Sequence, residues 1–81
     1  MTNTNQIINK VEQELPGRNV CMMAGYKDGY VFCAPKGSMD TNNPYFTCDR
    51  NGSNIEAFSI LEDPKGFDNA VQNHMIYDES E

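Results

Sequence analysis

Apolar residues recur at helical spacing in two stretches, one near each end of the chain. A helix over residues 4–15 gathers its apolar side chains on a single stripe, which consists of Ile7, Ile8, Val11 and Leu15. Pro16 and Gly17 end this helix, because proline disfavours helical geometry at the residue before it and glycine frees the chain to turn. We therefore expect an amphipathic first helix with one side against a core.

The second stretch begins with a helix-start signal at Asp63 and Pro64. Asp is a favoured N-cap residue, and Pro suits the first helical position. The apolar stripe that follows is interrupted only by one histidine at its edge and consists of Phe67, Ala70, Val71, His74 and Met75. We expect Ile76 and Tyr77 to extend this contact before an acidic tail over residues 78–81 frays.

Two β-hairpins are predicted between these helices. The first joins the apolar runs 19–26 and 30–34 through Asp28 and Gly29, and Asp-Gly is a strong hairpin signal. As a two-residue turn it pairs Ala24 with Cys33, Gly25 with Phe32 and Tyr26 with Val31.

The second hairpin joins residues 45–50 and 53–58 through Asn51 and Gly52, a pair that the type I′ turn prefers. Its register pairs three sets of residues across the strands: Cys48 with Ile55, Phe46 with Ala57, and Tyr45 with Phe58. A polar loop over residues 35–43 connects the two hairpins.

These elements predict an α+β fold. Each has one apolar side, and the economical arrangement is a two-layer sandwich, in which a four-stranded antiparallel sheet carries both helices on one face in the order α-β-β-β-β-α. We expect a single domain over residues 1–77, followed by the acidic tail. The predicted core contains Ile7, Ile8, Val11, Leu15, Val20, Met22, Val31, Cys33, Phe46, Cys48, Ile55, Ala57, Phe67, Val71 and Met75.

The second face of this sheet is expected to stay uncovered and to present aromatic residues to solvent. These are Tyr30, Phe32, Tyr45 and Phe58, with Asp49 and Glu56 among the charged residues beside them. Aromatic anchors inside a polar rim are typical of protein-binding surfaces. We interpret these six residues as a partner-binding site, with homodimerisation through this face and stabilisation of the sheet by aromatic pairs as alternatives.

Charge and hydropathy narrow the classes of function. The 81 residues include 12 acidic and 6 basic ones, which gives a formal charge of -6. Direct nucleic-acid binding is disfavoured, because it depends on Lys and Arg that neutralise phosphates. No stretch approaches the roughly 20 apolar residues of a membrane helix, and the N-terminus lacks the order of a secretory signal. We expect a soluble cytoplasmic protein that does not bind membranes.

Residues with catalytic or metal-binding chemistry are sparse. Cys21, Cys33 and Cys48 contain no Cys-x-x-Cys pair, and the only histidine, His74, lies far from them along the chain. We interpret the cysteines as small apolar residues of strands. No serine, cysteine or paired-carboxylate motif accompanies His74, so we predict no catalytic residues, no metal site and no cofactor.

A hairpin with Pro44, Tyr45, Asp49 and Gly52, followed by Phe58 and a helix at Phe67, resembles a group of small bacterial and phage proteins. These are related in outline to immunity proteins of polymorphic toxin systems. The similarity covers about a third of the chain, from residue 43 to residue 71. It implies a non-catalytic protein that works by binding another protein.

Together these observations predict an inhibitor or immunity-like accessory protein that occludes a protein partner, such as a toxin or a host defence enzyme. The alternative is an acidic protein of phage origin that mimics nucleic acid, of the anti-CRISPR or anti-restriction type. In that case the surface is formed by Asp63, Asp68, Asp78, Glu79 and Glu81.

Overall fold

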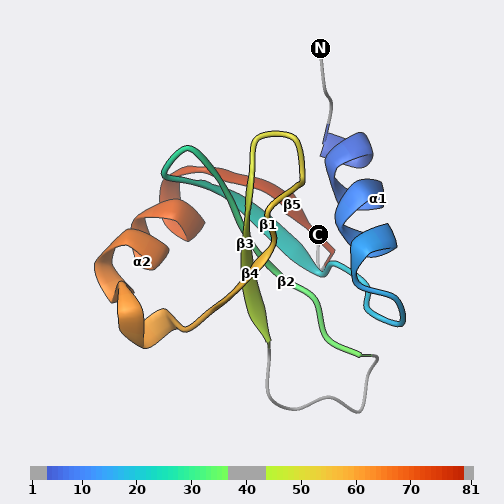
Figure 1. The fold of residues 1–81 in the computed structure, drawn as a ribbon. Coiled ribbons are helices and arrows are strands. Elements are labelled where there is room, and N and C mark those ends of the chain that lie inside the picture. Colours follow the sequence, from blue (N-terminus) through green and yellow to red (C-terminus); the bar gives the residue numbers. More distant parts are fainter. Residues whose placement is uncertain (1–3, 37–43, 80–81) are drawn as a thin grey trace.

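The computed structural model describes residues 4–36 and 44–79, which form two helices and an antiparallel sheet (Figure 1). The class is α+β, as predicted, but the sheet has five strands in the order β4-β3-β2-β1-β5. The elements are α1 (Thr4–Glu14), β1 (Met22–Tyr26), β2 (Gly29–Cys33), β3 (Tyr45–Asp49), β4 (Glu56–Phe58), the 3₁₀ helix η1 (Ile60–Glu62), α2 (Pro64–Asn73) and β5 (Met75–Asp78). Most of the loop over residues 35–43 lies outside the described residues.

The end of α1 and the start of α2 lie near their predicted positions and reflect local signals. Helix α1 buries Ile7, Ile8 and Val11 and ends just before Pro16. Helix α2 starts at Pro64, and the Asp63 carboxylate accepts a hydrogen bond from the Gly66 N–H at 3.1 Å. This cap satisfies one of the N–H groups that have no partner inside the helix.

The predicted extension of the second helix through Ile76 and Tyr77 is wrong. Helix α2 ends at Asn73, and Met75–Asp78 forms β5, which pairs with β1 through Met23 and Tyr77. The free edge of β1 offers unpaired backbone groups that this segment satisfies. The start of the expected acidic tail is ordered for the same reason, because Asp78 belongs to β5 and the Glu79 N–H donates to the Cys21 carbonyl at 2.9 Å.

The first hairpin is shifted by two residues from its predicted register. Ala24 faces Val31 and Tyr26 faces Gly29, so the turn consists of Lys27 and Asp28, with Lys27 at φ 52°. Gly29 is needed inside the sheet, because a side chain there would collide with the backbone of Cys48 in β3. A shift of two residues keeps the predicted alternation within the strands, with Ala24 and Val31 on one face and Met23 and Phe32 on the other.

The second hairpin has the predicted register for Tyr45 opposite Phe58 and Phe46 opposite Ala57, but the predicted pairing of Cys48 with Ile55 is not part of the ladder. Strand β4 is nevertheless short and begins at Glu56. The preceding loop is held by the Asp49 carboxylate, which accepts hydrogen bonds from the backbone N–H groups of Asn51 and Ser53.

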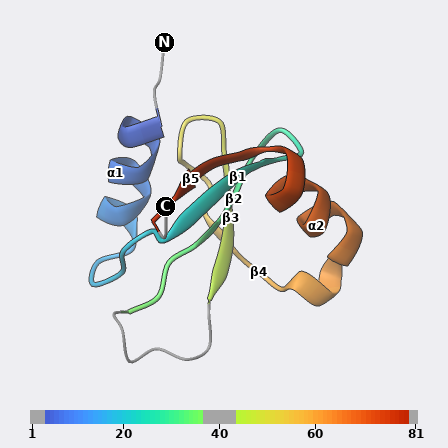
Figure 2. The same cartoon turned by 180° about the vertical axis from the view of Figure 1, so that it is seen from behind.

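The two helices lie on opposite faces of the sheet (Figures 1 and 2), so the predicted placement of both on one face is wrong. One face, here called the α1 face, packs Met23, Phe32 and Cys48 against α1. The other, the α2 face, packs Ala24 and Val31 against Ala70 of α2.

The error arises from the pairing between the two hairpins. Phe32 lies opposite Phe46 and Tyr30 opposite Cys48, so the apolar side of the second hairpin continues the Tyr30 and Phe32 side of the first. The predicted core joined Phe46 and Cys48 to Val31 and Cys33 instead. The fully buried Met23 and Phe32 were therefore left out of it. Ala57, which was included, is exposed.

The prediction that the cysteines are buried residues of strands is confirmed for Cys33 in β2 and Cys48 in β3. Cys33 and Cys48 are buried and Cys21 is half-buried, and none of the three forms a disulfide bond. Burial raises the pKa of the Cys48 thiol to about 11, so this thiol stays protonated and unreactive near neutral pH.

Replacing Phe32 by Ala tests the burial of the α1 face. Phe32 has 0% of its side chain exposed, and deletion of a buried aromatic ring typically costs about 3–5 kcal/mol. We expect the free energy of unfolding, measured by urea denaturation, to fall by about this amount. A loss below about 1 kcal/mol would place Phe32 at the surface, because surface substitutions usually change stability by less than that.

Candidate functional site

The aromatic residues predicted as anchors do not share one bare face. Phe32 belongs to the core and half-buried Tyr30 packs against the same cluster, so both lie on the α1 face. Tyr45 and Phe58 lie on the α2 face. The cause is again the pairing of β2 with β3, which places the aromatic sides of the two hairpins on opposite faces.

Tyr45 and Phe58 instead hold α2 on the sheet. Both rings contact Phe67 of α2, with ring centroids 5.0 Å away for Tyr45 and 6.2 Å for Phe58. Phe58 also meets Tyr26 of β1 edge-on at 5.4 Å. Such pairs stabilise packing beyond the area they bury, so these aromatics act within the fold.

The acidic residues of the predicted site do come together. A groove of about 570 Å³ lies on the α2 face between β4, the turn after β1 and the start of α2. We call it the acidic groove. Five carboxylates line it, those of Asp28, Asp49, Glu56, Glu62 and Asp63. The ammonium of Lys27 and the side chains of Tyr26, Thr47, Ala57 and Phe58 also contribute to the lining.

Asp49 is fixed in this groove by the loop that it organises. Its carboxylate accepts hydrogen bonds from the backbone of Ser53 and Asn51 at 2.9 Å and from the Asn54 side chain at 2.8 Å. These bonds to the charged form, together with the charge of Lys10, hold the pKa of Asp49 below its usual range.

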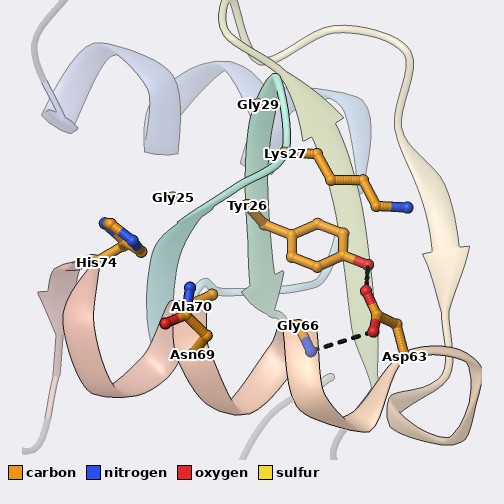
Figure 3. A pocket seen from close by; sticks show the side chains of 9 residues that line it. All are labelled: Gly25, Tyr26, Lys27, Gly29, Asp63, Gly66, Asn69, Ala70 and His74. Carbon is orange, nitrogen blue, oxygen red and sulfur yellow. Dashed lines mark hydrogen bonds between the residues drawn. The ribbon is translucent and has the colours of Figure 1, made fainter.

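Asp63 and Tyr26 form the second fixed pair, which joins β1 to α2 (Figure 3). The Tyr26 hydroxyl donates to Asp63 Oδ2 at 2.7 Å while Asp63 Oδ1 caps the helix at Gly66. The Tyr26 hydrogen bond, the Gly66 hydrogen bond and the charge of Lys27 lower the pKa of Asp63. Burial, the bond to Asp63 and the charges of Asp63 and Glu62 raise the pKa of Tyr26 to about 12.

The four described residues of the alternative acidic surface do not gather in one place. Asp63 lines the acidic groove, whereas Asp68 is exposed on α2. Asp78 and Glu79 border a different, mostly apolar groove beside Met22 and Tyr45. Glu81 lies outside the described residues.

His74 lines a smaller pocket of about 320 Å³ next to the acidic groove. Figure 3 shows its ring at the opposite end of this pocket from the Tyr26 and Asp63 pair. Within residues 4–36 and 44–79, no three His, Cys, Asp or Glu side chains are arranged to hold a metal ion. No helix in the same part of the chain is long and apolar enough to cross a membrane.

Three groove residues that the sequence analysis passed over are Asp28, Glu62 and Tyr26. Glu62 had a signal, because Ser59 and Glu62 form the S-x-x-E pattern of a capping box, and both of its hydrogen bonds are present. The positions of Asp28 and Tyr26 depend on the first hairpin's register and on the docking of α2.

Comparisons with protein-family models, with curated proteins and with solved structures give no match. The groove must therefore be interpreted from the chain's own residues.

The Tyr26→Phe variant tests the alkaline side of the Tyr26 and Asp63 pair. Because the pKa of Tyr26 is raised from 10.0 to about 12 on folding, its neutral hydroxyl contributes stability that is complete below pH 10 and is lost as the pH rises through about 12. We expect the wild type to lose unfolding free energy across this window more steeply than Tyr26→Phe. If the free energies of unfolding of the two proteins, measured by urea denaturation, changed equally with pH across this window, the stabilising role of the hydrogen bond between Tyr26 and Asp63 would be contradicted.

Asp63→Asn tests the acid side, since Asn retains the helix cap but cannot ionise. The pKa of Asp63 is lowered on folding, so its charge contributes stability above the unfolded pKa of about 3.9 that is lost as the pH falls through the folded value. We expect the stability difference from the wild type to be constant above about pH 5 and to shrink in acid. A difference independent of pH would show that the charge contributes nothing.

Proposed function

We propose that this chain is a non-catalytic protein-binding protein, an inhibitor or immunity-like factor that acts by covering a basic surface of a protein partner. The observation that carries the proposal is the acidic groove, in which five carboxylates face a single ammonium. Such an excess attracts Lys and Arg side chains, and complementary charge raises association rates and selects partners.

The groove is also held in shape before any partner arrives. Hydrogen bonds fix the carboxylates of Asp49 and Asp63, and the Ser59 backbone fixes that of Glu62 at 2.8 Å. Binding therefore loses less side-chain entropy than it would with freely moving acids, which favours affinity for a partner that fits.

The protonation states in the groove favour binding over acid–base catalysis. A general acid or base works best with a pKa near the operating pH. The pKa values of Asp49 and Asp63 are lowered, and that of Tyr26 is raised to about 12, so each is displaced away from neutrality. These groups stay in one charge state near pH 7, as a binding surface requires.

A mimic of nucleic acid is the second candidate, because the same five carboxylates would also compete for a groove that binds phosphates. The two candidates differ in the partner's natural ligand. Duplex DNA or RNA added to the complex would displace a mimic from its partner, whereas a protein inhibitor of another kind would remain bound.

The double variant Glu56→Gln/Glu62→Gln tests the proposal. Gln preserves the capping box at position 62 while two groove charges are removed. The partner is first isolated by crosslinking the wild-type chain in the cells that produce it, and affinities are then measured by calorimetry on the purified complex. We expect the double variant to raise Kd about tenfold and to weaken its dependence on salt.

The matched control, Glu14→Gln/Asp68→Asn, removes the same charge from two exposed residues outside the groove. We expect this control to change Kd by less than about twofold, since distant surface charges are screened. An equal loss in both double variants would reduce the effect to net charge and would contradict a groove-based site.

A further inference from the structure

Leu61 is the most exposed large apolar residue of the described chain, with 89% of its side chain accessible to solvent. Single exposed leucines are common on protein surfaces and need no explanation by themselves. The backbone that carries Leu61, however, is fixed by hydrogen bonds.

Four hydrogen bonds hold the turn at η1. The Leu61 N–H donates to Ser59 Oγ at 3.3 Å, and the Ser59 N–H donates to the Glu62 carboxylate at 2.8 Å. The N–H groups of Glu62 and Asp63 donate to the carbonyls of Ser59 and Ile60. Asp63 then binds Tyr26 and caps α2, so the turn is tied to both sheet and helix.

The turn also stands beside the acidic groove. Glu62 and Asp63, the two residues after Leu61, line the groove, and the segment from β4 to α2 that carries them runs along the outside of the molecule in Figure 1. Leu61 is therefore an exposed apolar residue directly next in sequence to the lining of the groove. An apolar side chain that is already positioned binds without the cost of ordering a loop.

We propose that Leu61 is an anchor that enters an apolar pocket bordered by Lys or Arg on the protein partner. This inference rests on the proposed function and adds the kind of surface that the partner presents. The charge of the border follows from the carboxylates of Glu56, Glu62 and Asp63 in the groove next to the anchor.

A second copy of the chain does not fit this description. The apolar groove formed by Met22, Tyr45 and Phe67 is bordered by Asp78 and Glu79. A second groove, beside Leu15 and Phe46, is of mixed polarity and is bordered by Glu14. Insertion of Leu61 into either groove would bring carboxylates against carboxylates on two chains that each carry a formal charge of -6.

The experiment places a photo-crosslinking amino acid at position 61, with position 76 as the control. Ile76 is the other exposed large apolar residue, at 40% exposure, and it lies on β5 rather than at the groove. We expect position 61 to crosslink to a partner segment that contains both apolar and basic residues. We expect position 76 to give no crosslink to the same segment.

Calorimetry with the purified partner then compares Leu61→Ser, Leu61→Met and Ile76→Ser. We expect Leu61→Ser to raise Kd about tenfold, the loss typical of a truncated apolar anchor, while Leu61→Met and Ile76→Ser stay within about twofold of the wild type. The melting temperature of Leu61→Ser should not change, because the side chain is exposed in the free protein.

The groove variant Glu56→Gln/Glu62→Gln separates this inference from the proposed function. If the groove variant weakens binding and Leu61→Ser does not, the proposal that Leu61 is an anchor is wrong and the groove remains the proposed binding site. If neither variant weakens binding, both proposals fail. An equal loss in Ile76→Ser would also overturn the anchor, because any exposed apolar residue would then have the same effect.

Discussion

Strands β1 and β2 bury apolar side chains on both of their faces, and the arrangement of the other elements depends on this. Met23 and Phe32 face α1, whereas Ala24 and Val31 face α2. An antiparallel sheet often leaves one face to water, but strands that are apolar on both sides require cover on both. The central hairpin of this small domain therefore lies between two helices, one contributed by each end of the chain.

The acidic groove is a consequence of how little helix is available for the second face. Helix α2 packs against β1 and β5, and its Phe67 reaches β3 and β4, where it meets Tyr45 and Phe58. The remaining part of the face over β3 and β4 is lined by polar and charged residues such as Thr47, Asp49 and Glu56. The region that the helix leaves open is thus the one that carries the proposed binding site.

Elements set by local signals could be predicted from the sequence, whereas those set by contacts between distant segments could not. The Asp63 cap and the second hairpin's register follow from neighbouring residues. The relative faces of the hairpins depend on the pairing of Phe32 with Phe46 across the long connection between them, and no local pattern specifies that pairing. Residues 75–78 fit a helical stripe equally well, and only the free edge of β1 makes them a strand. Asp49 and Glu56 were predicted beside the aromatic residues and Asp63 in the alternative acidic surface, and all three line the acidic groove, whereas Phe32 lies in the core.

The most direct test of this account is a set of nuclear Overhauser contacts between helix side chains and the central hairpin. The two-sided arrangement predicts contacts from Val11 and Ile7 of α1 to Met23 or Phe32, and separate contacts from Ala70 of α2 to Ala24 or Val31. Contacts from both helices to the same set of strand side chains would place them on one face. That result would contradict the arrangement and remove the groove that depends on it.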